Sequence, residues 1–246
     1  MPLRGLTMHA TLNESLQELA KGCRILHAEG HADLTLGHLA LRDPDGRGAW
    51  IKRSGISLGE VRSDADFMLI DWQGEPLAGC GQRHKEWPIH IEIFRARPDV
   101  LVCGHSHPHY ATLFSALDVP LVAVTNEAAY LRGKPGRFDA TTGLIDTPEL
   151  GRQLARSLGS AFTVLMQNHG ITYVGRSIAE CVLMGLFLER ACRSQLILMS
   201  TGLPYRSTPE EALEGKSEQI LDARLMANFW AFHQRNLDAM PDSRLG

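Results

Sequence analysis

The stretch Val100-Leu-Val-Cys-Gly-His-Ser-His-Pro108 decides how this chain is interpreted. Its apolar first half predicts a buried strand over residues 99–104. His105 and His107 follow directly, and side chains at alternate positions of an extended segment point to the same side. Both imidazoles could therefore reach one metal ion. The alternative is a pair of ordinary turn histidines, because His-x-His also occurs by chance.

A second apolar segment, predicted as a strand over 162–167, also leads to a histidine. His169 lies just beyond it and is followed by Gly170, which permits a sharp turn and a close approach of the backbone. Three neutral imidazoles leave coordination positions open for a substrate, which is typical of a catalytic rather than a structural metal site. The alternative interpretation is that these histidines only end strands.

Glu86 is the candidate fourth member of this group. It begins a helix predicted over 86–96, where Pro88 is tolerated in the first turn. A carboxylate beside a divalent cation can bind it or transfer a proton. Glu86 and His90 are four residues apart and share one face of this helix. The alternative is a first-turn residue that is favoured by the helix dipole.

Capping and turn signals predict the other elements. Thr11 and Glu14 form a capping box that opens a helix over 11–29, and Ser177 with Glu180 opens another over 177–200. Several strands follow one another without a crossover helix, which indicates an α/β fold with a mostly antiparallel central sheet. The remaining predicted elements are strands at 39–42, 49–52, 67–71 and 171–174, helices at 109–117, from Thr147 and over 208–236, and a loop over 132–146.

Composition limits the classes of function. The 246 residues carry a net charge of −3 and no cluster of Lys and Arg, which argues against a nucleic-acid partner. The five cysteines are odd in number and widely spread, which indicates free thiols in a reducing compartment. With no apolar segment long enough to span a membrane and no leader pattern, we expect a cytoplasmic protein. No linker divides the chain, so we expect one domain over 1–246.

Four motifs in order resemble one family. The chain looks like a member of the class II aldolase/adducin family, with matching spacing from about residue 12 to 200. The motifs that carry the resemblance are Glu86-Trp-Pro-Ile-His90, Arg97-Pro-Asp-Val100, His105-Ser-His-Pro108 and Asn168-His-Gly170. The resemblance implies a three-layer α/β/α domain that assembles as a homotetramer. It also implies a divalent metal held by His105, His107 and His169, with Glu86 as ligand or acid/base. Three histidines suit zinc, and manganese would also bind with an added carboxylate or water.

Departures from the family pattern indicate a branch within it. Sugar-phosphate aldolases of the family carry small hydroxyl and amide donors around the substrate phosphate. This chain has bulky cationic or titratable residues at the matching positions, Gly37-His38, Lys52-Arg-Ser-Gly55 and His84-Lys85. With Arg83, these residues suit a carboxylate substrate. The pattern resembles the branch of decarboxylases of hydroxylated aromatic or pyridine dicarboxylates. The alternative for each basic residue is a solvated surface charge.

The sequence therefore predicts a metal-dependent lyase that decarboxylates a hydroxylated aromatic or pyridine dicarboxylate. His38, Lys52, Arg53 and Arg83 are expected to bind this substrate, and Glu86 or His84 to deliver a proton to the ring carbon. Two alternatives remain open. One is an aldolase that cleaves a hydroxy-keto acid or a sugar phosphate, and the other is a non-catalytic, adducin-like scaffold. Adducin-like members typically lack the metal histidines, which this chain keeps.

Overall fold

The computed structural model describes residues 11–131 and 133–241, and its centre is an eight-stranded sheet in the order β4-β3-β2-β1-β5-β8-β7-β6. All neighbouring strands are antiparallel except β6 and β7, which are parallel. The strands are β1 (His38–Arg42), β2 (Gly48–Lys52), β3 (Phe67–Asp71), β4 (Pro76–Ala78), β5 (Val102–Ser106), β6 (Gly136–Phe138), β7 (Thr163–Met166) and β8 (Gly170–Gly175).

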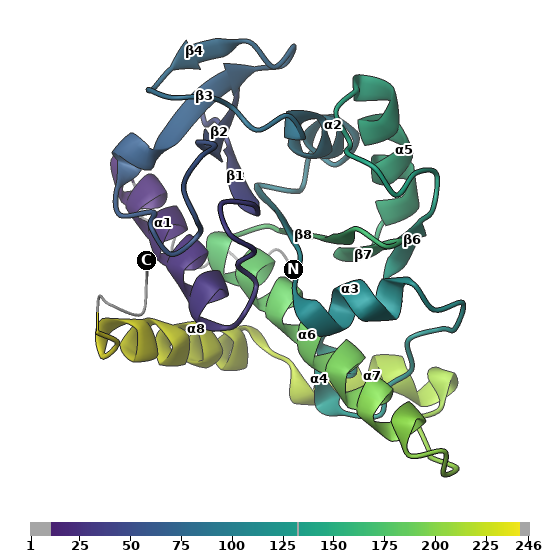
Figure 1. Cartoon of the computed structure of the whole chain (residues 1–246). Helices are drawn as coiled ribbons and strands as arrows, with labels where there is room; N and C mark the ends of the chain where they lie inside the picture. The colour runs from purple at the N-terminus through teal and green to yellow at the C-terminus, as the bar shows by residue number, and fades with distance from the viewer. Residues whose placement is uncertain (1–10, 132, 242–246) are drawn as a thin grey trace, which may run out of the picture.

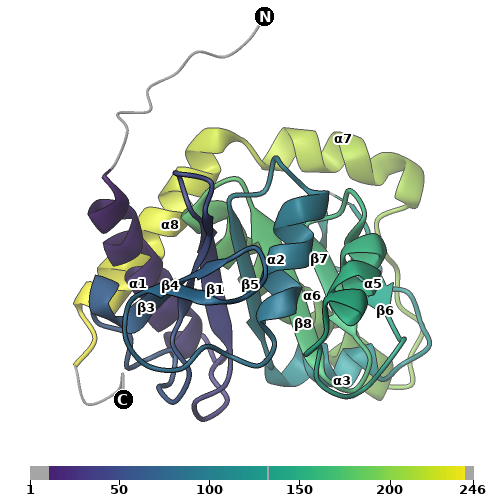
Figure 2. The same cartoon turned by 90° about the horizontal axis from the view of Figure 1, so that it is seen from above.

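Helices cover both faces of the sheet (Figure 1). Helices α2 and α5 pack together on one face, while α1, α3 and α6 contact the strands from the other. Figure 2 shows β3 and β4 beside α1 at one end of the molecule, and β6 beside α5 at the opposite end. The helices are α1 (Leu12–Ala28), α2 (Trp87–Ala96), α3 (His109–Ser115), α4 (Asn126–Tyr130), α5 (Pro148–Leu158), α6 (Ile178–Ser200), α7 (Glu210–Ile220) and α8 (Ala223–Asp238). The predicted three-layer α/β/α architecture is confirmed.

The structure corrects several predicted boundaries. The loop expected over 132–146 contains β6, which pairs along the edge of the sheet with β7. The helix expected over 208–236 is two helices, because Asp222 caps a new one by accepting a hydrogen bond from Leu225 N at 2.7 Å. The predicted strand over 99–104 lies further along, as β5, and so includes His105. Helix α4 and strand β4 were not predicted, because each is short.

Both predicted capping boxes have their N-cap hydrogen bond, but only one of the two boxes is complete. Thr11 and Glu14 exchange hydrogen bonds at the start of α1. At the start of α6, Ser177 accepts from Glu180 N, while the Glu180 carboxylate accepts from Arg176 N, one residue before the cap. The capping box predicted at Ser177 is therefore wrong in the hydrogen bond expected of the Glu180 side chain, which accepts from Arg176 N.

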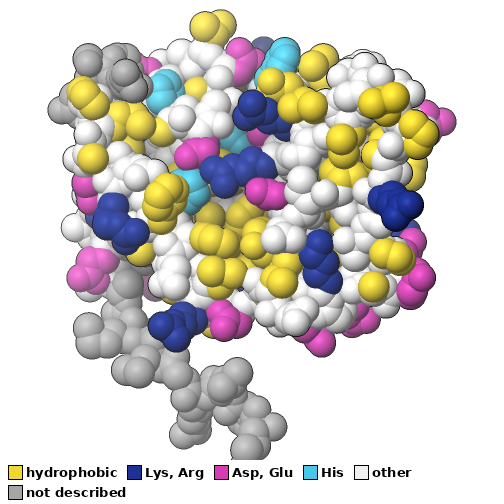
Figure 3. Space-filling model, turned by 90° about the horizontal axis from the view of Figure 1, so that it is seen from below, with side chains coloured by type: hydrophobic (Ala, Val, Ile, Leu, Met, Phe, Trp, Pro, Cys, Tyr) yellow, Lys and Arg dark blue, Asp and Glu magenta, His cyan; other side chains and the backbone are white. Residues whose placement is uncertain are grey.

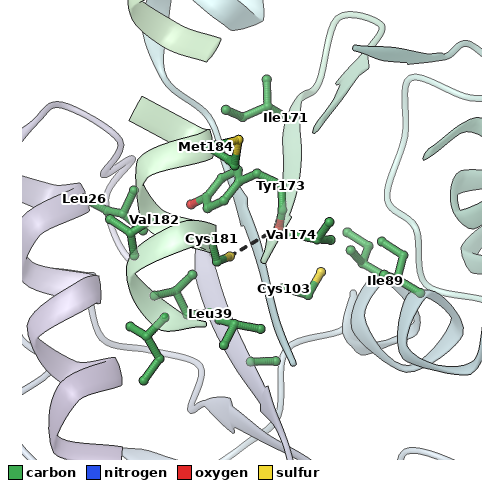
Figure 4. Close-up of a cluster of buried hydrophobic side chains, with 14 of the residues drawn as sticks. Leu26, Leu39, Ile89, Cys103, Ile171, Tyr173, Val174, Cys181, Val182 and Met184 are labelled. Atoms are coloured by element: carbon green, nitrogen blue, oxygen red, sulfur yellow. Dashed lines mark hydrogen bonds between the residues drawn. The ribbon is translucent and has the colours of Figure 1, made fainter. Parts of the chain in front are cut away.

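The core beneath the histidines is organised around Tyr173 of β8 (Figure 4). Its ring is fully buried between β5 and α6, and a Cβ atom at Gly104 would overlap it. Gly104 therefore lets β8 and α6 approach β5 closely, one residue before His105. The antiparallel pairing of β5 with β8 then sets His105 opposite Thr172 and Ser106 opposite Ile171. This register brings the end of β5 next to the loop that carries His169.

Four of the five cysteines are buried, Cys80 is exposed, and all are free thiols. No helix among residues 11–131 and 133–241 is long and apolar enough to cross a membrane. On the face shown in Figure 3, Lys and Arg side chains are scattered among acidic ones, and histidine side chains reach the surface between them. This face carries no continuous basic stripe over its described residues, in line with the absence of a Lys/Arg cluster in the sequence.

Candidate metal centre

Three imidazoles and one carboxylate converge at the end of β5. His105 is the fourth residue of β5, His107 directly follows the strand, and His169 lies in the β7–β8 loop. The Nε2 atoms of His105 and His107 are 3.0 Å apart. Glu86 places Oε2 3.5 Å from His105 Nε2 and Oε1 3.4 Å from His169 Nε2. One ligand atom from each of the four residues lies within 4.8 Å of the others.

Backbone conformation fixes the loop that carries His169. Asn168 adopts a left-handed conformation with φ of 54°, which turns the chain between β7 and β8. Gly170 lies so close to β5 that a Cβ atom there would be 2.6 Å from both His107 Cδ2 and Ser106 O. The glycine that the sequence marked as a turn residue is thus needed for contact between the two histidine-bearing segments.

Glu86 is the N-cap residue of α2, but its side chain makes no capping hydrogen bond. Its Oε1 instead accepts from Ile145 N at 2.9 Å, which holds the buried carboxylate toward the imidazoles. Burial alone would raise the pKa of Glu86, but His105, Ile145 N–H and His169 outweigh it and lower the pKa to about 2. The carboxylate is therefore ionised at neutral pH.

The chemistry of this donor set fits a divalent cation. His105 Nδ1 lies 3.0 Å from Ile171 O, and because a carbonyl oxygen only accepts, Nδ1 carries a proton, which leaves Nε2 as the nitrogen that can face a metal. Burial lowers the pKa of His107 and of His169 to about 4, so both are neutral at neutral pH. Neutral imidazoles with an ionised carboxylate are ligands that zinc and manganese accept. At 3.0 Å the two Nε2 atoms share a proton when no cation is bound, and a cation between them would take the place of that proton.

A second group of histidines adjoins the first. His38 Nδ1 lies 2.6 Å from His90 Nε2, so one of the two nitrogens donates to the other. The His38 ring centroid is 4.3 Å from that of His84 and 5.2 Å from that of His105. Burial lowers the pKa of His84 and of His90 to about 3, so both are neutral. His84 Nε2 is buried without a hydrogen-bond partner.

The three cationic side chains expected to bind substrate have other partners. The Lys52 ammonium is fully buried and donates to the carbonyls of Thr35, Arg53 and Ile56, which ties two loops together. Burial lowers the pKa of Lys52 to about 8. Arg53 forms an ion pair with Asp66 at 3.2 Å. The Arg83 guanidinium lies 5.2 Å from the centroid of the Trp87 ring.

A cavity of about 480 Å³ opens beside two of the candidate ligands, His107 and His169. No Lys or Arg belongs to the described residues that line it, and three leucines are about half exposed within it. The cavity thus brings a small molecule from solvent to the side of the cluster formed by His107 and His169. Its other lining residues are Asp33, Leu36, His109, Thr112, Leu113, Thr142, Gly143, Leu144 and Asn168.

Two members of this region were not assigned a role from the sequence. His90 was placed on one helix face with Glu86, and that spacing was the available signal for its contact with His38. Nothing in the sequence indicated a role for Asp33, because it lies in a loop 74 positions before His107 and the two side chains meet only in the folded chain.

Comparison with known proteins identifies the family of the chain. Residues 17–196 match the family described as Class II Aldolase and Adducin N-terminal domain, and the chain belongs to this family. It is similar to decarboxylase NovR of Streptomyces niveus, with 32% identity over 72% of this chain and 67% of that protein. It is also similar to a 3,4-dihydroxyphthalate decarboxylase of Arthrobacter keyseri, with 26% identity over 82% and 84% of the two chains.

A solved structure extends the likeness to nearly the whole chain. L-fuculose 1-phosphate aldolase from Glaciozyma antarctica PI12 superposes with a TM-score of 0.81 and 23% identity, over 98% of this chain and 96% of that one. This likeness shows the class II aldolase fold. The family supports a lyase, and members of this class depend on a metal, for which the four converging side chains are a candidate site.

Proposed function

We propose that this protein is a divalent-metal-dependent decarboxylase of a hydroxylated aromatic or pyridine carboxylate. The observation that carries the proposal is the convergence of three imidazole Nε2 atoms and an ionised carboxylate beside an open cavity. Two relatives whose names describe decarboxylases support the choice of reaction. The name of the second relative indicates a hydroxylated aromatic dicarboxylate, which is the first substrate class to test.

In this proposal His105, His107 and His169 hold the metal, and Glu86 is a ligand or a proton carrier. A bound divalent ion supplies Lewis acidity to the carboxylate and hydroxyl of the substrate. The bond between the ring carbon and the carboxylate carbon breaks as carbon dioxide leaves. The electron pair of this bond remains on the ring carbon, which must then receive a proton. Because Glu86 is ionised, it can take the proton of the substrate hydroxyl and return it to the ring.

His84 is the second candidate for the proton transfer. His84 lies two positions before Glu86 in the chain, and its Nε2 is buried without a hydrogen-bond partner, so we assign a substrate group as the partner of this nitrogen. We propose His38 as a substrate contact beside it. We assign Lys52 to loop packing instead of substrate binding, because three carbonyls surround its ammonium. Arg53 and Arg83 would bind a second carboxylate only by leaving Asp66 and the Trp87 ring.

The main rival is an aldolase acting on a sugar phosphate or a hydroxy-keto acid. His38 and His84 lie at two of the positions where the family resemblance expects small phosphate donors, and their buried rings are 4.3 Å apart. Each lost charge-assisted hydrogen bond to phosphate is worth about 1.5–3 kcal/mol, so two would weaken such a substrate by about a hundredfold or more. This difference favours the decarboxylase.

A substrate screen with metal-loaded protein tests the proposal. Hydroxylated aromatic mono- and dicarboxylates and ketose phosphates are tested separately as substrates, and both carbon dioxide and aldehyde are measured in each assay. We expect carbon dioxide from at least one aromatic acid. Cleavage of a ketose phosphate with no carbon dioxide from any acid would overturn the decarboxylase and leave the family membership standing. Protein that binds no stoichiometric metal would instead favour a non-catalytic, adducin-like scaffold.

A further inference from the structure

Two of the three candidate ligands, His105 and His107, differ in what holds the ring nitrogen that faces away from the centre. His105 Nδ1 donates to a backbone carbonyl inside the sheet, that of Ile171. His107 has no such backbone partner among the described residues, and its Nδ1 lies 3.3 Å from Asp33 Oδ2. Because His107 Nε2 points toward His105, Nδ1 must carry the proton if Nε2 is to bind a metal.

We propose that Asp33 is a positioning residue for the metal centre, which it serves by holding His107 in the tautomer and orientation that direct Nε2 at the metal. A carboxylate that accepts from the outer nitrogen of a histidine ligand also makes the imidazole a stronger electron donor. The inference rests on the metal site of the proposed function and is independent of the reaction that the site catalyses.

The backbone around Asp33 supplies an independent observation. Residues 33–36 form a tight turn in which Leu36 N donates to Asp33 O at 2.8 Å. Within this turn Leu34 has a φ of 50°, a left-handed conformation that bulky residues rarely adopt, and its side chain is 83% exposed. Burial of Leu34 therefore does not explain the conformation. Strained backbone of this kind concentrates at functional sites, where the surrounding structure imposes it.

The alternative role for Asp33 is a direct contact with substrate. Asp33 lines the cavity beside His107, and its side chain is 47% exposed. A substrate hydroxyl could therefore reach the carboxylate in place of, or in addition to, the imidazole. The two roles differ in one measurable quantity, because only a positioning role changes metal affinity in the absence of substrate.

The experiment compares Asp33→Asn and Asp33→Ala with a matched pair, Asp99→Asn and Asp99→Ala. Asp99 has a similarly exposed side chain, at 42%, but pairs with Arg97 instead of with a metal ligand. Affinity for Zn²⁺ and for Mn²⁺ is measured by competition with a chromophoric chelator, without substrate. The thermal unfolding of each metal-free variant is recorded alongside, so that a general loss of structure is recognised.

We expect Asp33→Ala to weaken metal binding by about 10–100-fold. Asp33→Asn should lose less, because the amide oxygen still accepts a hydrogen bond but carries no charge. The Asp99 variants should bind metal within about twofold of the wild type, because solvent and salt screen a distant surface charge. Unfolding temperatures of the metal-free Asp33 variants should stay close to that of the wild type.

Unchanged metal affinity in both Asp33 variants would overturn the inference. So would an Asp33→Ala protein that keeps its metal affinity but binds substrate poorly, since this would make Asp33 a substrate contact. Failure of the wild type itself to bind metal would overturn the metal centre. The two failures are thus distinguishable.

Discussion

His105 and His107 lie two residues apart and point at the same centre, yet the fold holds them in different ways. His105 is fully buried within β5, and its Nδ1 donates to the Ile171 carbonyl of the neighbouring strand. His107 lies beyond the strand, against a half-exposed carboxylate from a surface turn. The sheet therefore fixes the buried side of the centre, while a loop side chain determines the exposed side. We expect substitutions on the buried side to affect folding as well as metal binding.

The largest expected effect separates His105→Ala from His107→Ala. Both variants should lose most of their metal affinity and activity, because each lacks one ligand. His105→Ala should also lower the free energy of unfolding of the metal-free protein by about 1–3 kcal/mol, because it leaves a cavity and an unpaired buried carbonyl at Ile171. His107→Ala should cost less, because it leaves no buried carbonyl unpaired and its partner Asp33 is half exposed to solvent. Urea unfolding measures both, and equal losses would refute the contrast between the two sides.

A smaller effect, confined to turnover, is expected for Glu86→Gln on the buried side. The amide oxygen can still accept from Ile145 N, so the contact between the start of α2 and the loop that carries Ile145 should persist. If Glu86 carries the proton, turnover should fall by about 10²–10⁴-fold with the metal retained. Steady-state rates and elemental analysis of the same preparation decide the outcome. A near-normal rate would remove Glu86 from the chemistry, and a loss of metal would make it primarily a ligand.

Acid should destabilise the metal-free protein through its buried histidines. Burial lowers the pKa of His31 and of His90 from 6.5 to about 3 in the folded chain. Between these values the unfolded state binds more protons, so stability is present above pH 6.5 and is lost as the pH falls toward 3. Each such histidine contributes a slope of up to about 1.4 kcal/mol per pH unit.

Urea unfolding at a series of pH values measures this slope, and His31→Gln is the matched variant. The glutamine cannot titrate but can still form a hydrogen bond with Ser106 Oγ, the partner of His31 Nδ1 at 3.0 Å. We expect the variant to show a shallower fall in stability with acid. An unchanged profile would mean that His31 takes up its proton in the folded state as readily as in the unfolded one.

The smallest effect concerns the exposed side, at Leu34. Leu34→Gly should raise the free energy of unfolding by about 0.5–1 kcal/mol, the difference between the cost of a left-handed non-glycine residue and the extra entropy of glycine in the unfolded chain. Leu203→Gly is the control, because Leu203 is 69% exposed but does not have a positive φ, and this change should destabilise. A Leu34→Gly protein no more stable than the wild type would show that the turn stores no strain.

Much of the fold was predictable because its signals are local. Helix caps and apolar strands depend on neighbouring residues in the sequence. The capping pair Thr11 and Glu14, the cap at Thr147 and the predicted apolar strands are all present in the structure. Strand β6 was missed because its three residues, Gly136-Arg-Phe138, are too few to show a strand pattern, and it exists only through its pairing with β7. The break between α7 and α8 was missed because Asp222 could equally lie inside a helix. The homotetramer, the cytoplasmic location and the single domain stay predictions.

The sequence by itself determined the family, the three-layer fold and the spacing that sets His105 and His107 on one side of a strand. Those properties depend on motif order and on the two-residue period of an extended chain. Only the tertiary structure decided that Asp33 meets His107, that His38 meets His90 across 52 positions, and that the Lys52 ammonium is enclosed by carbonyls. The physical reason is that such contacts depend on strand register and on the paths of loops. These bring together residues from distant segments, and no local sequence pattern specifies which segments meet.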